Sequence, residues 1–412
     1  MDAQRHDETQ QDGAARRVHP TIHLFVARAL RDFGDGFVSV LLPVYLLALG
    51  FTPFQVGVIA TVALLGSALL TLAVGFLGVR FDHRQLLLAA AVLMTATGAA
   101  FAAVHDYALL LVAALLGTIN PSAGSVSVFV PLEHAVLARE ATDQERTRIF
   151  ARYSLAGALA ASLGALAAAL PDIATRAGID RLTAVRAMFV LYALIGIVGG
   201  AVYSRIPARP PAADQHKPAA LGPSRGIVYK LAALFSLDAL AGGFIVQSLL
   251  VLWLFERFDM SLGAAGTFFF CAGLLSAVSF PVAAWLSQRI GLVNTMVFTH
   301  IPSSLLLILA ALAPSLPLAL ALLLLRFGLS QMDVPARSSY VMAVVTPAER
   351  AAAASVTSVP RSLAAALSPA LSGALLAAAF KGWPLIVAGV LKIIYDILLL
   401  IQFRHVKPPE ER

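Results

Sequence analysis

The sequence predicts an all-α membrane protein with twelve transmembrane helices, arranged as two pseudo-symmetric bundles of six. Three observations support this fold class. First, 59% of the 412 residues are hydrophobic and only 13% are charged, which is too apolar for a water-soluble protein of this size. Second, apolar runs of about 20 residues, the length that a helix needs to cross a membrane, recur along the whole chain. Third, a polar stretch rich in proline separates two sets of such runs near the middle of the chain.

The apolar runs place the helices in order along the chain. Their expected ranges are 22–49, 54–78, 85–104, 107–134, 150–170, 185–205, 227–255, 262–287, 292–313, 316–344, 351–379 and 383–403. These ranges divide the chain into a tail at 1–21, an N-terminal bundle at 22–206, a linker at 207–226, a C-terminal bundle at 227–405 and a second tail at 406–412.

Lys and Arg are distributed unequally between alternate loops. With the N-terminus in the cytosol, the cytosolic segments hold roughly threefold more of these residues than the opposite segments, as the positive-inside rule expects. Trp253 and Trp383 lie near helix ends on the opposite side, where aromatic anchors are common. The polar first 20 residues lack the apolar core of a signal peptide. Because Arg outnumbers Lys and alanine is abundant, we expect a multi-pass protein of a bacterial inner membrane with cytoplasmic N- and C-termini.

Several functional classes find no support in the sequence. No basic run with interleaved aromatic residues points to nucleic-acid binding. No metal-ligand cluster, phosphate-binding glycine loop or nucleophile motif occurs, so we expect no enzyme, no cofactor, no metal and no ATP-driven pump. The single Cys271 lies in an apolar run and is expected to be a small packing residue.

Internal repetition connects the two halves. The turn after the fourth helix reads TDQER (Thr142–Arg146) and the turn after the tenth reads TPAER (Thr346–Arg350). The loop after the second helix, GFLGVRFDHRQL, has its counterpart after the eighth in AWLSQRIGLVNT. Two homologous bundles joined by a long cytosolic loop are typical of transporters with a midplane site.

These motifs resemble the major facilitator superfamily, whose second-to-third loop usually reads GxLxDRxGRR. Val79 replaces the acidic residue of that pattern and Asp82 replaces its second glycine, while the second copy has Gln288 at the acidic position. The residues that follow the pattern are Gly75, Leu77, Arg80, Phe81 and Arg84, and, in the second copy, Arg289, Ile290 and Gly291. The charged loop residues Arg80, Arg84, Arg289, Glu349 and Arg350 are therefore candidates for a structural or gating role on the cytosolic face.

The resemblance implies a monomeric secondary active transporter that moves a small solute by rocking its two bundles, with helices 1, 4, 7 and 10 lining the cavity. It does not assign a subfamily. Drug/proton antiporters of the superfamily carry an Arg in helix 4 and a GPxxGG stretch in helix 5, and this chain has neither.

Carboxylates within the apolar runs are candidates for proton coupling, because charges inside a membrane need a partner or an aqueous cavity. Arg28 and Asp32 are four residues apart in helix 1, as are Arg31 and Asp35, so internal neutralisation competes with proton or substrate coupling. Asp238 in helix 7 has no cationic neighbour at helical spacing. What the resemblance implies is that Asp32, Asp35 and Asp238 approach one aqueous path; the alternative is that Asp238 neutralises Arg326 or Arg361.

Arginines form the second set of candidates. Arg326 in helix 10 and Arg361 in helix 11 lack local partners, and an arginine fork suits a carboxylate or phosphate. Each is expected to hold an anionic solute group or to be the counter-ion of an aspartate. Asp333 and Arg337 are four residues apart in the favourable order, so they are expected to form a structural or gating pair.

The other polar residues of the spans receive simpler interpretations. Lys392 and Asp396 are expected to pair with each other, His300 to be a hydrogen-bonded structural residue, and Glu133 and His134 to lie at the membrane interface. Three residues are candidates to line the cavity: Asn120, Gln247 and Gln331.

Three functions are compatible with these features. The first is proton-coupled efflux or exchange of a small organic compound by an antiporter. The second is uptake of an anionic metabolite bound by the midplane arginines. The third is a non-transporting receptor or lipid-handling protein on the same scaffold.

Overall fold

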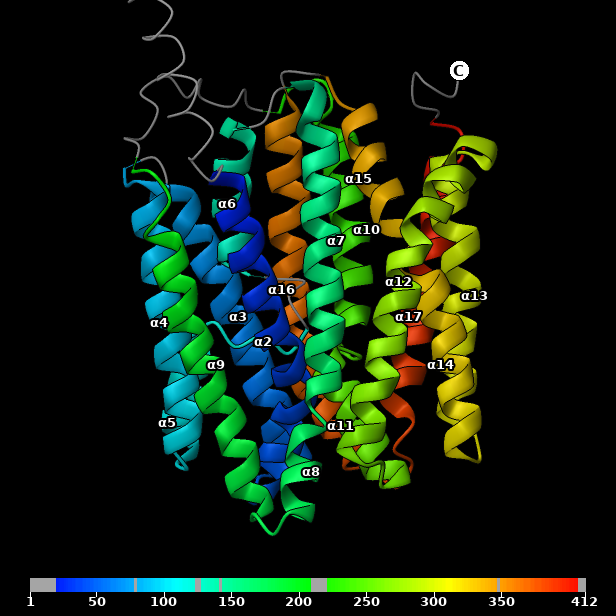
Figure 1. Ribbon diagram of the computed structural model, residues 1–412. Helices are drawn as coiled ribbons and strands as arrows, with labels where there is room; N and C mark the ends of the chain where they lie inside the picture. The colour runs from blue at the N-terminus through cyan, green and yellow to red at the C-terminus, as the bar shows by residue number, and fades with distance from the viewer. Residues whose placement is uncertain are drawn as a thin grey trace, which may run out of the picture.

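The computed structural model describes residues 20–77, 80–122, 127–140, 143–208, 221–346 and 349–406. The regular secondary structure of these residues is entirely helical (Figure 1). The helices are α2 (Pro20–Ala48), α3 (Pro53–Leu77), α4 (His83–Ala103), α5 (Tyr107–Leu116), α6 (Phe129–Glu140), α7 (Asp143–Ala167), α8 (Leu170–Arg176), α9 (Arg181–Tyr203), α10 (Arg225–Gly243), α11 (Gln247–Phe258), α12 (Leu262–Ile290), α13 (Leu292–Leu312), α14 (Leu316–Ser330), α15 (Asp333–Ala343), α16 (Arg350–Leu376) and α17 (Trp383–Phe403).

Each expected span corresponds to one helix or to two consecutive helices. Within the described ranges, ten helical segments are long and apolar enough to cross a membrane. The first span falls outside this set because α2 carries two arginines and two aspartates, and the fourth because α5 and α6 are separated. The expected all-helical membrane fold is therefore confirmed.

Three spans that were expected to be continuous are interrupted near their centres. Between α5 and α6 lies Pro121, which has no N–H to donate to a preceding turn. Pro335 lies in the first turn of α15, where the missing N–H is tolerated, and a continuous helix would have required it to bond Gln331. Between α10 and α11 the break follows the adjacent glycines Gly242 and Gly243, which lower the helix propensity. The breaks expose backbone groups in the middle of the protein.

The two halves of the chain pack against each other through α3 with α16 and α7 with α12. The first crossing is close because it places Gly57 against Pro369: a Cβ atom on Gly57 would lie 2.4 Å from the Pro369 carbonyl oxygen. The Ala370 N–H also donates to Thr61 Oγ1 at 3.0 Å across this crossing. In this conformation the two halves are therefore joined by close backbone packing and by a hydrogen bond.

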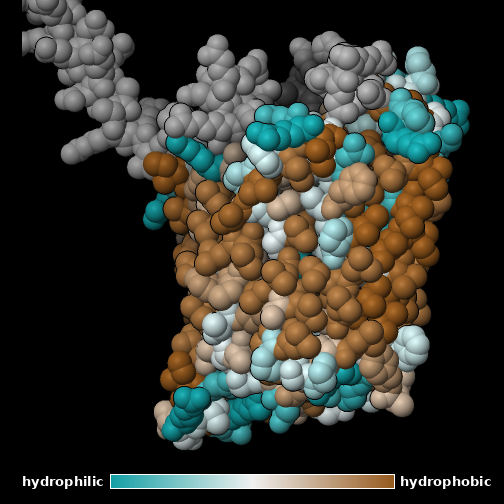
Figure 2. All heavy atoms as spheres, turned by 90° about the vertical axis from the view of Figure 1, so that its right-hand side faces the viewer, coloured by the Kyte–Doolittle hydropathy of each residue, from teal (hydrophilic) through white to brown (hydrophobic). Residues whose placement is uncertain are grey.

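The outer surface is that of a multi-pass membrane protein. Figure 2 shows a broad hydrophobic belt between hydrophilic ends. Large apolar side chains such as Val278, Leu325 and Ile401 are exposed on this surface, as lipid contact requires. The start of α2 and the end of α17 lie at the same end of the bundle (Figure 1). The expected division into bundles and linker stays a prediction, and residues 209–220 of that linker lie outside the described residues.

Candidate solute-binding site

A cavity of 540 Å³ lies where the interrupted spans meet. It is bordered by Gly242, Gly243 and residues 245–247 at the break between α10 and α11, by Ser330 and Gln331 at the break between α14 and α15, and by Ser122 after α5. The Ser248 N–H donates to the Pro121 carbonyl at 3.0 Å, which joins two of these breaks. Further lining residues are Leu64, Asp238, Leu250, His300, Arg326, Phe327, Asp333, Arg337, Arg361, Ser362, Ala365 and Lys392.

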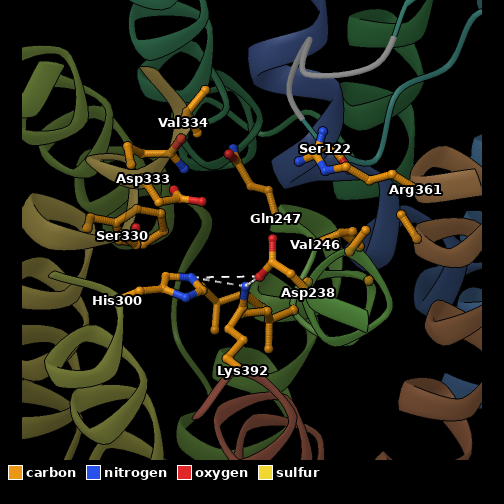
Figure 3. Close-up of a pocket in the computed structure, with 18 of the residues that line it drawn as sticks. Ser122, Asp238, Val246, Gln247, His300, Ser330, Asp333, Val334, Arg361 and Lys392 are labelled. Carbon is orange, nitrogen blue, oxygen red and sulfur yellow. Dashed lines mark hydrogen bonds and ion pairs between the residues drawn. The ribbon is translucent and has the colours of Figure 1, made fainter. Parts of the chain in front are cut away.

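Asp238 is the carboxylate at the centre of the ionic network (Figure 3). Lys392 Nζ donates to its Oδ1 at 2.6 Å and Arg337 Nη1 donates to its Oδ2 at 2.9 Å. His300 Nε2 lies 3.8 Å from Oδ1. Its direct ion pairs are with Arg337 and Lys392, and neither Arg326 nor Arg361 contacts it directly. That Asp238 neutralises one of these arginines over a longer distance stays a prediction.

Lys392 and Asp396 do not pair with each other, contrary to the expectation from their spacing. Lys392 bonds Asp238, whereas Asp396 lies 3.0 Å from His300 Nδ1. The reason is that α17 packs against both α10 and α13, so the two side chains find acceptors and donors on different helices. Both His300 and Lys392 line the cavity, and the local spacing contained no signal for this.

Arg326 and Arg361 lack an ionic or hydrogen-bonding partner among the described residues. The Nε atoms of both are buried and unpaired, and the Arg326 guanidinium lies over the Phe327 ring at 5.2 Å. Figure 3 shows Arg361 extending into the cavity in the direction of Ser122. The cavity wall carries four cationic side chains against two carboxylates, which leaves it with excess positive charge.

The helix 1 carboxylates lie in a separate buried network and do not border this cavity. Asp32 forms ion pairs with two arginines: its Oδ2 lies 2.6 Å from Arg28 Nε, and its Oδ1 lies 3.4 Å from Arg31 Nη2. Arg31 contacts Glu133 at 2.8 Å instead of Asp35, and Asp35 accepts a hydrogen bond from the Tyr192 hydroxyl at 3.1 Å. The structure therefore does not bring Asp32 and Asp35 together with Asp238.

Glu133 is fully buried, which corrects its expected position at the membrane interface. Its Oε1 accepts from the Tyr203 hydroxyl at 2.6 Å, and its Oε2 accepts from Arg31 and from the Tyr153 hydroxyl. The carboxylate thus connects α6 with α2, α7 and α9.

Two of the three polar candidates border the cavity. Gln247 and Gln331 line it, whereas Asn120 is absent from its wall and accepts a hydrogen bond from the Ser122 N–H at 2.8 Å. Gln247 Nε2 also donates to Ser39 Oγ at 2.9 Å, a direct bond between the two halves of the chain.

The candidate gating charges lie in different environments. Arg337 Nη1 is 3.2 Å from Asp333, and both residues border the cavity. Arg84 lies in the first turn of α4, which Asp82 caps, and Arg80 lies in the turn before it. Arg289 stacks over Trp285 at 4.4 Å, and Arg350 Nε donates to the Met342 carbonyl at 3.3 Å. Val79 and Thr142, the first residue of the TDQER turn, lie outside the described residues.

Glu349 holds the end of the linker region against the turn between α15 and α16. Its carboxylate accepts hydrogen bonds from Thr346 Oγ1 at 2.6 Å, from Ser224 Oγ at 2.7 Å and from the Gly222 N–H. These donors stabilise the ionised form and lower the pKa of Glu349 to about 2. The carboxylate therefore stays ionised at neutral pH.

Comparisons with known proteins agree with this architecture. The family model described as Major Facilitator Superfamily matches residues 24–254 and 231–412. An uncharacterized membrane protein of Saccharomyces cerevisiae is 24% identical over 416 residues, which covers 92% of this chain and 93% of the relative.

Solved transporters share the fold at low sequence identity. An inward-facing, unoccupied bacterial homologue of the human lysosomal transporter Spinster has a TM-score of 0.72 at 14% identity, covering 93% of this chain and 96% of that one. The nucleoside transporter NupG has a TM-score of 0.72 at 14% identity, covering 94% and 100%. The human organic anion transporter MFSD10 has a TM-score of 0.64 at 17% identity, covering 92% and 99%. Because the family model extends over nearly the whole chain, the protein belongs to the Major Facilitator Superfamily, a family of membrane transporters.

Proposed function

We propose that this protein is a secondary active transporter of a small organic anion, which binds in the cavity between Arg326 and Arg361 and crosses by alternating access. The observation that supports this proposal is the pair of arginines that border the cavity without a direct ion pair. A buried cation without a partner is costly, and a bound carboxylate or phosphate would compensate it with charge-assisted hydrogen bonds. Efflux and uptake are both compatible with this site.

The remaining lining favours an organic body on the anion. Leu64, Val246, Leu250 and Phe327 provide apolar contacts, and Gln247 and Gln331 provide amide groups. A largely apolar pocket with a few convergent polar groups is typical of small-molecule sites. One structural neighbour is described as an organic anion transporter, but at that identity it supports only the shared fold, so the arginines carry the proposal.

The site would operate in a membrane of defined orientation. We infer a monomer in a bacterial inner membrane. Both termini would lie in the cytoplasm, because the Lys and Arg residues are concentrated in the loops on that side. With this orientation, Glu349 and the end of the linker face the cytoplasm.

Arg326→Gln and Arg361→Gln should each weaken anion binding by about tenfold to a hundredfold, since each removes a charge-assisted hydrogen bond of about 1.5–3 kcal/mol. Fumarate and sulfate, which are a planar and a tetrahedral anion, serve as probes in titrations of the purified protein. Arg176→Gln is the matched control because Arg176 is exposed at the end of α8. Unchanged affinity in both cavity variants would contradict the proposed function.

Proton-coupled efflux or exchange through Asp35 is a second candidate, favoured by a specific contact. Asp35 is 2% exposed, and it accepts a hydrogen bond from the uncharged Tyr192 hydroxyl. A buried carboxylate without a cation binds a proton readily. Asp35 would then be a coupling site apart from the solute cavity.

If Asp35 is the coupling site, Asp35→Asn should abolish the stimulation of fumarate flux by a pH gradient in proteoliposomes, while fumarate exchange at equal pH on both sides continues. The asparagine keeps the size and the hydrogen bond but cannot carry a proton. A variant with undiminished stimulation would exclude Asp35 as the coupling site. Binding without any flux in the original protein would favour the third class, a non-transporting receptor or lipid-handling protein.

A further inference from the structure

His300 lies between two carboxylates and an ammonium group, at the side of the cavity where α10, α13 and α17 meet (Figure 3). Its Nδ1 is 3.0 Å from Asp396 Oδ1 and 3.1 Å from Oδ2. Its Nε2 is 3.4 Å from Lys392 Nζ and 3.8 Å from Asp238 Oδ1. Each ring nitrogen therefore faces a different charged group.

These contacts indicate which nitrogen of the neutral His300 ring carries the proton. The carboxylate of Asp396 can only accept, so Nδ1 carries the proton and donates to it. Nε2 then presents a lone pair, and the Lys392 ammonium, which has three donors, contacts both that lone pair and Asp238 Oδ1. In this state Lys392 is held away from any solute in the cavity.

Protonation of the His300 ring at Nε2 removes the hydrogen bond that Lys392 donates to this nitrogen. Nε2 becomes a donor, so it can no longer accept from Lys392 and instead requires an acceptor, which Asp238 Oδ1 provides from 3.8 Å. The imidazolium and the ammonium would also repel each other at 3.4 Å in a buried setting. A small movement of the Lys392 chain into the cavity, whose wall it already forms, relieves both conflicts.

We propose that His300 is a proton-binding site whose protonation transfers Lys392 from Asp238 to the bound anion, so that the anion is carried together with a proton. This inference rests on the proposed function, because it assumes that the solute is an anion in this cavity. It makes Lys392 a third cationic ligand that is available only in the protonated state.

Charge balance points to the class of solute. The cavity and its neighbouring network contain the cations Arg326, Arg337, Arg361 and Lys392 and the carboxylates Asp238, Asp333 and Asp396. With neutral His300 the sum is one positive charge, and with protonated His300 it is two. A dianion, such as a dicarboxylate or a phosphate monoester, together with one proton leaves the buried site neutral, which is the favourable condition at low dielectric.

The charged and titratable groups around His300 come from the helices that pack against α13, which are α12, α14, α15 and α17, and from α10. Helix α17 contributes Lys392, Tyr395 and Asp396, and α10 contributes Asp238. Helix α14 carries Arg326, α15 carries Asp333 and Arg337, and the charged residue of α12, Arg289, lies in its last turn.

The test is the affinity of the full-length protein for fumarate and for sulfate between about pH 6 and pH 8, across the ordinary titration range of histidine. Both probes remain dianions in this range, so a change in affinity reports on the protein. We expect the affinity of the original protein to rise about tenfold as the pH falls, and the affinity of His300→Gln to be independent of pH. His405→Gln is the matched control, because His405 is exposed just after the end of α17. Its affinity for the probes should depend on pH as in the original protein.

Proton uptake on binding provides a measurement that does not need the variant to fold. In weakly buffered solution at neutral pH, fumarate should draw up to about one proton per bound molecule into the original protein. Binding of fumarate alone supports a dicarboxylate site, and binding of sulfate alone supports a phosphate-type site. Affinity without pH dependence, a His300→Gln variant that retains the dependence, or binding without proton uptake overturns the inference and leaves the anion site intact. Failure of both probes to bind at any pH overturns the proposed function together with the inference.

Discussion

Asp238→Ala should lower the free energy of unfolding by about 3–5 kcal/mol, because it leaves a buried cation without its counter-ion. Lys392 has its ion pair with Asp238 and is 8% exposed. Arg337 would retain Asp333 at 3.2 Å, so most of the loss should arise at Lys392. Thermal unfolding of the detergent-solubilised protein measures the effect.

A second substitution separates the ionic contribution from a general loss of packing. Adding Lys392→Met to Asp238→Ala removes the unpaired ammonium and should recover most of the lost stability, because an apolar replacement of a buried ion pair is often close to neutral. If the double variant is as unstable as Asp238→Ala alone, the ion pair is not the source of the effect.

Glu133→Ala should have an effect of similar size in the other half of the chain, about 3–5 kcal/mol. The substitution leaves the Arg31 guanidinium with Asp32 at 3.4 Å and deprives the Tyr153 and Tyr203 hydroxyls of their acceptor. Since Glu133 connects α6 to α2, α7 and α9, the loss should reduce the cooperativity of unfolding of this half. The same unfolding measurement applies.

The matched control for Glu133 is a glutamate in an ion pair that is accessible to water. Glu256 pairs with Lys381, and their side chains are 23% and 34% exposed. Glu256→Ala should cost less than about 1 kcal/mol, because exposed pairs contribute little. Equal losses in the two variants would show that burial does not decide the strength of these pairs.

The sequence anticipated the helices well because their signal is local. An apolar run of sufficient length must form a helix in a membrane, where each backbone N–H and C=O needs an internal partner. The lengths of the apolar runs did not predict the interruptions of the spans, although Pro121 and Pro335 are local causes of two of them. The cavity at these breaks could not be located from the runs, since it depends on how three interrupted spans meet.

The charged candidates were recognisable as residues, but their partners were not. Arg326, Arg361 and Asp238 stand out as charges in apolar runs, and all three border the cavity. The partner of Asp238 is Lys392, 154 positions away, and the partner of Arg31 is Glu133, 102 positions away. Spacing along a helix shows which residues share a face, and it carries no information about which helix that face meets.

The sequence by itself determined that this is a helical membrane protein, because the length of apolar runs is a property of the chain alone, and its repeated motifs predict two homologous halves. Only the tertiary structure decided that Asp32 and Asp35 belong to one buried network and Asp238 to another, and that Arg326 and Arg361 face the cavity without a direct ion pair. The physical reason is that the energy of a buried charge depends on the groups within a few ångströms of it, and helix packing brings those groups together from distant parts of the chain.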